Sequence, residues 1–229
     1  GDVYKRQAGE HARAGKDVVI CDEQDRPGGH LVHLGKEVPA DLLAVLDMPN
    51  VTYLPRTIVN GLYDQGYTVA NERRTDHLDS KVHTKEARIR TWHFRAEHTV
   101  LATGAYQRHL VFANNDLPGV MLSHAAATYV ARDGVDVFKS AVVVTVDNQG
   151  YRDAVRLHNA GVKINAIVDC RPSASGASVD AARALGITIM NSKTAVDACI
   201  DEKKKTVKCV EIGNLDGSDS ACIDADLVA

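Results

Sequence analysis

The chain has 229 residues, a formal net charge of −3 at pH 7, 45% hydrophobic residues and 25% charged residues. These are ordinary values for a globular protein, and the length allows one or two domains with a buried core. The slightly acidic balance argues against nucleic-acid binding, which needs a basic face. Neither a bilayer-spanning apolar run nor the apolar segment of a signal peptide is visible. We therefore expect a cytoplasmic protein without nucleic-acid or membrane partners.

The five cysteines are Cys21, Cys170, Cys199, Cys209 and Cys222. An odd number without close spacing argues against a disulfide framework. No pair has the CxxC or CxxxxC spacing of a zinc site or a redox-active disulfide, so we predict neither. The thiols that end apolar runs, Cys21 and Cys170, are expected to be buried and reduced. The scattered histidines lack metal-ligand spacing, and no metal site is expected.

The amino-terminal stretch indicates half of a dinucleotide-binding unit. Gly1–Gln7 is polar and non-periodic, and we interpret it as a non-native addition. Ala8–Ala14 resembles the end of a helix, and Asp17–Cys21 is a β-branched strand followed by Asp22 and Glu23. In a βαβ dinucleotide unit, the carboxylate at this strand end accepts hydrogen bonds from ribose hydroxyls. Simple solvation of the strand end is an equally weighted alternative. The strand and GxGxxG loop of the first half are absent, so we expect truncation upstream.

Paired glycines follow six residues after Asp22, in Arg26-Pro27-Gly28-Gly29. Glycines without a Cβ would let the chain pass close to a nucleotide. A plain turn is the alternative, because Pro-Gly-Gly forms one in any case. The spacing from the acid to the glycines favours the ligand, so Asp22, Glu23, Gly28 and Gly29 are candidate cofactor-binding residues.

A short amphipathic helix at Val38–Leu46 and then a β-meander are expected. The meander strands are predicted at Val51–Leu54, Thr57–Tyr63, Tyr67–Glu72, Ala87–Arg95 and His98–Leu101. The last run is apolar and leads into Ala102-Thr103-Gly104, which indicates a buried strand whose end meets a ligand through bare backbone. Ala102, Thr103 and Gly104 are therefore further candidate cofactor-binding residues.

A turn at Asn115–Gly119 and a helix with Ser123 as N-cap complete the first domain, residues 8–135. A second α/β unit occupies residues 136–229. Its strands are predicted at Ala141–Val146, Lys163–Asp169 and Ile187–Met190, its helices at Tyr151–Ala160 and Ser178–Leu185, its hairpin at Ala195–Ile200 and Thr206–Ile212, and its final strand at Ile223–Val228. This βαβαβ order predicts a parallel sheet with right-handed crossovers.

The loop Val146–Gly150 occupies the position of a dinucleotide glycine loop but has one glycine where the fingerprint has three. Asp147 would place negative charge near the helix N-terminus, where a pyrophosphate binds. We therefore expect the second unit to have the fold without the phosphate cradle and to support the first unit. Weak binding and a different ligand are the alternatives.

Four stretches are the most identifying: ARAGKDVVICDEQDRPGG, GLYDQGY followed by ERRTDHL, LATGAYQRHLVFANNDLPGVMLSHAAATYVARDGV, and LHNAGVKINAIVDCRP. Together they resemble the alpha subunits of heterotetrameric sarcosine oxidases over most of Ala8–Ala229. The resemblance implies an α/β fold of the two-dinucleotide-binding-domain flavoprotein type. This FAD/NAD(P)-binding, Rossmann-like fold would carry the β-meander and an inserted second βαβαβ unit.

The resemblance also implies an activity. Members of that family oxidatively demethylate sarcosine to glycine and produce hydrogen peroxide. The alpha subunit binds NAD, FMN lies between alpha and beta, and the beta subunit carries FAD and the small amine substrate. Gamma and delta subunits complete the hetero-oligomer, and a tetrahydrofolate site would lie beyond Ala229. No catalytic residue is expected in this chain, which alone would be inactive.

By position in the resemblance, Asp22 or Glu23 would hold the adenosine ribose and Gly28 and Gly29 would line the same nucleotide. Ala102, Thr103 and Gly104 would form the strand-end contact beside it. His109 stands where the family usually has proline.

Three other interpretations stay open. A related flavin-dependent dehydrogenase of opines, proline or glycine shares the ATGA and PGV elements, although NDLPGVML and the degenerate second loop favour sarcosine oxidase. A disulfide reductase would need a CxxxxC spacing, which is absent. A non-catalytic scaffold, in which neither nucleotide site is occupied, is the alternative from a different class.

Overall fold

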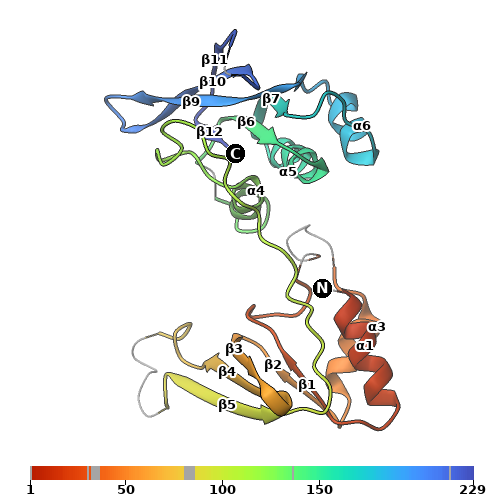
Figure 1. The fold of residues 1–229 in the computed structure, drawn as a ribbon. Coiled ribbons are helices and arrows are strands. Elements are labelled where there is room, and N and C mark those ends of the chain that lie inside the picture. The colour runs from red at the N-terminus through yellow and green to blue at the C-terminus, as the bar shows by residue number, and fades with distance from the viewer. Residues whose placement is uncertain (1, 30, 32–36, 80–85, 136, 217) are drawn as a thin grey trace. The chain divides into compact units, whose positions relative to one another are not determined.

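The computed structural model describes residues 2–29, 31, 37–79, 86–135, 137–216 and 218–229 (Figure 1). The chain divides into two compact units, Gly1–Ala105 and Tyr106–Ala229. The sequence placed residues 106–135 with the first domain. In the structure, Leu110, Phe112 and Val120 pack against a core cluster of unit 2, which explains why the division falls after Ala105.

Unit 1 begins with α1 (Asp2–Arg13), followed by β1 (Val18–Cys21), α3 (Ala40–Ala44), a 3-10 turn η1 (Val45–Asp47) and β2 (Val51–Leu54). Residues 2–7 therefore lie in a helix, where the sequence predicted no element. The predicted helix at Val38–Leu46 corresponds to α3 and η1. β1 and β2 pair in parallel, and Ala8, Ile20 and Val45 form the small core beside them.

The meander of unit 1 is an antiparallel sheet in the order β3-β4-β5. Its strands are β3 (Thr57–Tyr63), β4 (Tyr67–Arg73) and β5 (Ile89–Arg95), with the 3-10 turn η2 (Asp64–Gly66) between the first two. Val51–Leu54 was predicted as a meander strand, and this prediction is wrong because β2 pairs in parallel with β1 instead.

The buried strand predicted at His98–Leu101 is not formed. These residues lie outside strands, and Val100 and Leu101 are 51% and 69% exposed. A strand exists only where a neighbour supplies ladder hydrogen bonds. No strand among the described residues pairs with this run, so its apolar character alone does not make it a strand.

Unit 2 contains the predicted βαβαβ order. Its elements are α4 (Ser123–Ala131), β6 (Ser140–Thr145), α5 (Asn148–Asn159), β7 (Lys163–Asp169), α6 (Ala177–Ala184), β8 (Ile189–Asn191), β9 (Lys193–Asp201), β10 (Thr206–Asn214), β11 (Ala221–Asp224) and β12 (Leu227–Val228). A parallel sheet runs in the order β12-β6-β7-β8, and an antiparallel sheet in the order β11-β10-β9. The α/β architecture with a meander and a βαβαβ unit is thereby confirmed.

The parallel sheet is covered on both faces (Figure 1). Successive side chains of a strand point to opposite faces. Ala141 and Val143 of β6 join the cluster that includes α4, α5 and α6, whereas Val142 and Val144 join the cluster that includes β9 and β10. Unit 2 is therefore a layered structure with the parallel sheet in the middle.

Two local predictions in unit 2 are wrong. The single strand predicted at Ile223–Val228 is divided between the two sheets, because β11 pairs with β10 and β12 pairs with β6. The break includes Asp226, whose carboxylate accepts the backbone N–H of Ser140 at 2.8 Å. Ser123 is not the N-cap of α4: Leu122 holds that position, and Gln107 Oε1 accepts the His124 N–H at 2.9 Å.

Two valines in and after β6 differ in burial and test the packing of this strand. Val143 is fully buried in β6, whereas Val146, just after the strand, is 53% exposed. Val143→Ala should lower the free energy of unfolding by about 2 kcal/mol, because it removes buried methyl groups and leaves a cavity. Val146→Ala should change it by less than about 0.5 kcal/mol. Urea unfolding followed by circular dichroism measures both values, and equal effects would contradict the layered arrangement.

Candidate cofactor site

The loop after β1 places the two predicted acids at a strand end. The Asp22 N–H donates to the Leu54 carbonyl at 3.0 Å, and the Asp22 carbonyl accepts the Thr57 N–H at 2.8 Å. These bonds fix the Asp22 backbone between β2 and β3. Asp22 Oδ1 accepts the Gln24 N–H at 3.0 Å, which orients the carboxylate at the end of β1. Asp22 is half-buried, whereas Glu23 is exposed.

Cationic and phenolic groups surround this loop. Arg56 lies 4.0 Å from the Asp25 carboxylate, and Arg73 donates to the Glu23 carbonyl at 3.3 Å. Burial raises the pKa of the Tyr53 phenol on β2, and the charges of Asp22 and Asp25 raise it further. The Tyr53 hydroxyl therefore stays protonated, and the carboxylates are the hydrogen-bond acceptors of the loop.

Gly28 and Gly29 belong to the same loop, with φ of +130° and +48°. Both values lie in the region that favours glycine. A turn explains these values as well as a nearby nucleotide does, so the geometry itself leaves both interpretations of the glycines open.

Ala102, Thr103 and Gly104 lie on an irregular segment after β5, and all three are exposed. Gly104 has φ of +73°, and no atom lies within 4 Å of the position that a Cβ would take. The bare backbone predicted there is accessible, although the strand that was expected to lead into it is not formed. Thus one loop of unit 1 carries Asp22, Glu23, Gly28 and Gly29, and a separate segment carries residues 102–104.

The loop of unit 2 has a different chemistry. Asp147 is the N-cap of α5, and its Oδ1 accepts the Gln149 N–H at 2.7 Å. A protein carboxylate therefore already satisfies a donor at the helix end where a pyrophosphate would bind. A Cβ on Gly150 would overlap the side chain of Thr145, so this glycine allows α5 to pack closely on β6. It has the packing role of the third fingerprint glycine.

Asp169 was not among the residues predicted from the sequence. It ends β7, at the position that a ribose-binding acid would take in this unit. The carboxylate is buried and accepts hydrogen bonds from the Tyr151 hydroxyl at 2.8 Å and from Arg171 Nη2 at 2.7 Å and Nε at 3.0 Å. Both oxygens are committed to groups of the same unit. An apolar strand that ends in Asp, with Arg two residues later, is the sequence signal for this cluster.

A second buried carboxylate joins α4 to α5. Asp153 accepts hydrogen bonds from the Ser123 hydroxyl at 3.0 Å and from the Gln149 amide at 3.1 Å, and His124 Nδ1 lies 3.6 Å away. Burial alone would raise the pKa of Asp153, but His124, Gln149 and Ser123 outweigh it and lower the pKa. The network stabilises the packing of the two helices.

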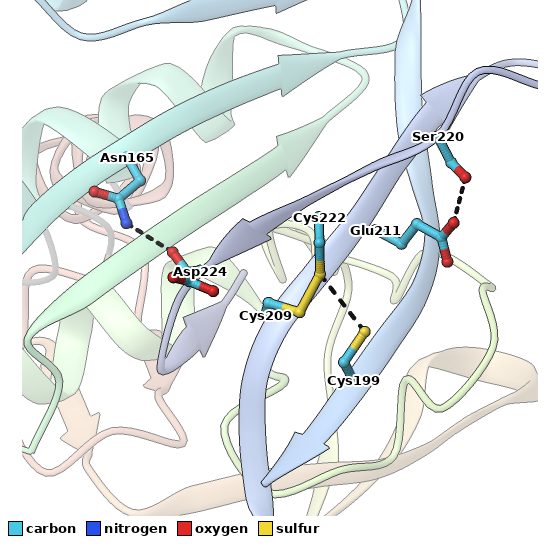
Figure 2. Close-up of a disulfide and its surroundings, with 7 residues drawn as sticks. All are labelled: Asn165, Cys199, Cys209, Glu211, Ser220, Cys222 and Asp224. Atoms are coloured by element: carbon cyan, nitrogen blue, oxygen red, sulfur yellow. Dashed lines mark hydrogen bonds between the residues drawn. A yellow bond between two sulfur atoms is a disulfide. The ribbon is translucent and has the colours of Figure 1, made fainter.

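The cysteine prediction is wrong for two residues. Cys209 of β10 and Cys222 of β11 form a disulfide with a Cα–Cα separation of 6.1 Å (Figure 2). Antiparallel pairing brings together residues that are 13 positions apart, which a search for short spacings does not detect. Cys21 and Cys170 are free, half-buried thiols.

An open surface depression in unit 1 is lined by Thr75, Asp76, Glu86 and Arg88. Its charges are paired, since Arg88 lies 2.5 Å from Asp76 and Arg74 pairs with Glu86. None of its lining residues is a predicted cofactor-binding residue.

The Asp169 cluster predicts an acid-dependent stability. Burial raises the pKa of Asp169, but hydrogen bonds from Arg171 and Tyr151 outweigh it, so the folded pKa is below the unfolded value. Asp169 therefore stabilises the fold above the unfolded pKa of about 4, and this contribution is lost as pH falls through the folded pKa. Asp169→Asn should flatten the fall in unfolding free energy below about pH 4.

The control for this prediction is Asp180→Asn, at an exposed carboxylate of α6 that pairs with Arg183 at the surface. This variant should leave the fall in unfolding free energy at acid pH unchanged. Urea unfolding at pH steps between roughly 2 and 6 measures the unfolding free energy of the wild type, Asp169→Asn and Asp180→Asn. If the unfolding free energy of all three proteins fell in parallel with pH, the Asp169 cluster would not contribute to the acid dependence of stability.

Comparison with solved structures identifies the fold. The chain superimposes on thioredoxin reductase from T. acidophilum with a TM-score of 0.63 and 15% identity, over 96% of this chain and 70% of that one. It superimposes on an NAD-dependent persulfide reductase from A. fulgidus with a TM-score of 0.64 and 13% identity, over 98% and 42% of the two chains. These similarities confirm the FAD/NAD(P)-binding, Rossmann-like flavoprotein fold.

Comparison of sequences identifies the family. No family model matches. The chain is 35% identical over 205 residues to the sarcosine oxidase subunit alpha of Corynebacterium sp. strain P-1, which covers 85% of this chain and 21% of that protein. It is 38% identical over 172 residues to the sarcosine oxidase subunit alpha of Rhizobium meliloti, and this match covers 71% of this chain and 17% of that protein. The chain thus spans about a fifth of the length of these curated relatives. Over this span, the chain belongs to the family of sarcosine oxidase alpha subunits.

Proposed function

We propose that the chain is the cofactor-binding region of the alpha subunit of a sarcosine oxidase-like flavoenzyme, with the adenosine ribose of NAD held by Asp22. The observation that carries this proposal is the position of the Asp22 carboxylate, held at the carboxyl end of a parallel strand by its bond from Gln24. In open α/β sheets, ligands bind outside the carboxyl ends of the strands. Gly28 and Gly29 on the same loop would line the nucleotide.

In unit 2, the acids near the corresponding strand ends are held by partners within the unit, and Asp147 lies at the helix end where a pyrophosphate rather than a ribose would bind. Asp147 caps its own helix, and the carboxylate of Asp169 is committed to Tyr151 and Arg171. The cofactor role is therefore assigned to unit 1, and unit 2 supports it. Between the two acids of unit 1, Asp22 is favoured over Glu23 because it is oriented by the backbone and half-buried.

The residues present fit one part of the cofactor. Ribose hydroxyls donate hydrogen bonds, and a carboxylate is the acceptor that suits them. Ala102, Thr103 and Gly104 provide accessible backbone on a further segment of unit 1. We assign no residue to the pyrophosphate, because the chain has no GxGxxG loop ahead of β1.

The chemistry of the whole enzyme is assigned outside this chain. NAD in this subunit, FMN at a subunit interface, FAD in a partner and a possible tetrahydrofolate site would together serve the oxidative demethylation of sarcosine to glycine with formation of hydrogen peroxide. The residues of this chain would bind and orient the nucleotide, and the beta, gamma and delta subunits would complete the assembly. A cytoplasmic location agrees with this role. No helix in the described parts of the chain is both long and apolar enough to cross a membrane.

A non-catalytic scaffold is the second candidate function. The observation in its favour is that Asp147 and Asp169 both use their carboxylates within unit 2, so that this unit has the nucleotide-binding architecture without its acceptors. The scaffold differs from the leading proposal in one measurable property, which is saturable binding of NAD.

Titration of NAD into a complete alpha subunit that carries this segment tests the proposal. The wild-type subunit should bind saturably. Asp22→Asn should weaken binding by roughly 10- to 100-fold, because hydrogen bonds to a charged acceptor contribute about 1.5–3 kcal/mol. Glu23→Gln should have a smaller effect, and Asp180→Asn on α6 is the remote control. Isothermal calorimetry gives the dissociation constants.

Two results would decide against the assignment. Absence of saturable binding to the wild-type subunit would favour the scaffold. A larger loss for Glu23→Gln than for Asp22→Asn would transfer the ribose contact to Glu23. Circular dichroism of each variant separates a lost contact from a lost fold.

A further inference from the structure

Three of the five cysteines meet on the antiparallel sheet of unit 2 (Figure 2). Cys199 lies on β9, Cys209 on β10 and Cys222 on β11, one on each strand. Their three sulfur atoms all lie within 4.8 Å of one another, and Cys199 Sγ is 3.7 Å from Cys222 Sγ. Cys209 and Cys222 form the disulfide, and Cys199 is a free thiol.

Strand register holds these cysteines together. Cys199 lies directly opposite Cys209 in the β9–β10 ladder. In the β10–β11 ladder, Cys209 lies opposite Asp224, so that Cys222, two residues before Asp224, is diagonal to Cys209. Opposite and diagonal residues on one face of an antiparallel pair are within side-chain reach. Strand pairing, and not the disulfide alone, therefore places the three cysteines together.

The cysteine face of the sheet points away from the core of unit 2. Ala198 and Val210, which alternate with the cysteines along β9 and β10, pack in the core instead. Cys209 is only 6% exposed, Cys199 is half-buried and Cys222 is exposed. The cluster thus has a buried side and a side that an ion can reach from solvent.

The arrangement of the sulfur atoms is triangular rather than linear. Thiol–disulfide exchange begins with attack by a thiolate on a disulfide sulfur, along the line of the bond that breaks. With an ordinary S–S bond, a linear approach of Cys199 to Cys222 would separate the outer sulfurs by roughly 5.7 Å. All three sulfurs lie within 4.8 Å. The geometry therefore disfavours direct exchange.

The Cys199–Cys222 edge of this triangle matches the ligand spacing of a thiolate metal site, and reduction releases the bonded Cys209–Cys222 edge to widen toward the same spacing. Zn–S bonds of about 2.3 Å in a tetrahedral site put sulfur ligands about 3.8 Å apart. The separation of 3.7 Å between Cys199 and Cys222 agrees with this spacing. Water from the exposed side would take the remaining position, as in zinc sites with three protein ligands.

The charges around the cluster favour a bound cation. The carboxylates of Asp197 and Glu211 place negative charge near Cys199, against the single positive charge of Lys208. A negative surrounding disfavours a bare thiolate but attracts a metal ion. Metal binding displaces the thiol protons and leaves thiolate ligands.

We propose that Cys199, Cys209 and Cys222 of the reduced protein form a three-thiolate site for a thiophilic metal cation such as Zn²⁺ or Cd²⁺, and that the disulfide is the oxidised, metal-free state. Reduction adds two electrons and two protons to the S–S bond and gives two thiols. A water-soluble phosphine supplies the electrons and becomes its oxide, with water as the source of oxygen and protons. The cation then replaces up to three thiol protons.

Cadmium titration tests the site. The chain is reduced with the phosphine, freed of reductant without air, and titrated with Cd²⁺ while the ultraviolet charge-transfer band of cadmium–thiolate bonds is followed. One equivalent should saturate the band. Cys199→Ser should weaken binding by at least about 100-fold, since loss of even an outer partner of a metal ligand costs 10- to 100-fold. Cys170→Ser is the matched control and should bind as the parent chain does.

Alkylation gives a readout that needs no variant. In the reduced chain, saturating Zn²⁺ should protect Cys199, Cys209 and Cys222 from iodoacetamide and leave the labelling of Cys21 and Cys170 unchanged, as measured by peptide mass spectrometry. The unreduced chain should show no cadmium–thiolate band. The proposal is overturned if the reduced chain shows no such band, if Cys199→Ser binds equally tightly, or if Zn²⁺ fails to protect Cys199.

Discussion

Unit 2 depends on the burial of β6 on both faces. Because side chains of a strand alternate, Ala141 and Val143 contact the helical layer while Val142 and Val144 contact the antiparallel sheet. A strand in this position must be apolar along its whole length, as parallel strands in covered sheets are. Polar side chains follow at the carboxyl end of β6, where Thr145 ends the strand and Asp147 caps α5. In a nucleotide-binding unit, the glycine-rich loop lies at this position.

The two units carry an acid at the same strand-end position in different surroundings. In unit 1, Asp22 follows a parallel strand, is half-buried and is oriented by a backbone N–H. In unit 2, Asp169 is buried, and Tyr151 and Arg171 fill its oxygens; burial and Asp169 in turn raise the pKa of Tyr151 to about 12. The same strand-end position thus carries a half-buried carboxylate in unit 1 and a buried one in unit 2, and the neighbouring donors differ between them.

Elements determined by local sequence were predicted well from sequence, and elements determined by distant pairing were not. The bounds of β3 and β7 agree with the prediction because apolar, β-branched runs end there at turn residues or a charge. His98–Leu101 has the same local pattern but pairs with no strand in the part of the chain that the structure describes. Ile223–Val228 crosses between two sheets near Asp226, whose carboxylate accepts the Ser140 N–H. For the candidate site, the acid and glycines were visible in the sequence, but the donors that occupy Asp169 are Tyr151 on α5 and Arg171 after β7, and only folding brings Tyr151 to the carboxylate.

The cysteine cluster also could not be predicted from local sequence. Spacing rules examine neighbours along the chain, whereas β9, β10 and β11 bring Cys199, Cys209 and Cys222 together across 23 residues. Ala198 and Val210 of the antiparallel sheet join the core cluster that packs on β6, whereas the alternating cysteines, of which Cys209 is buried, lie outside that cluster. The disulfide between Cys209 and Cys222 therefore adds a covalent link between β10 and β11 that local sequence spacing does not predict.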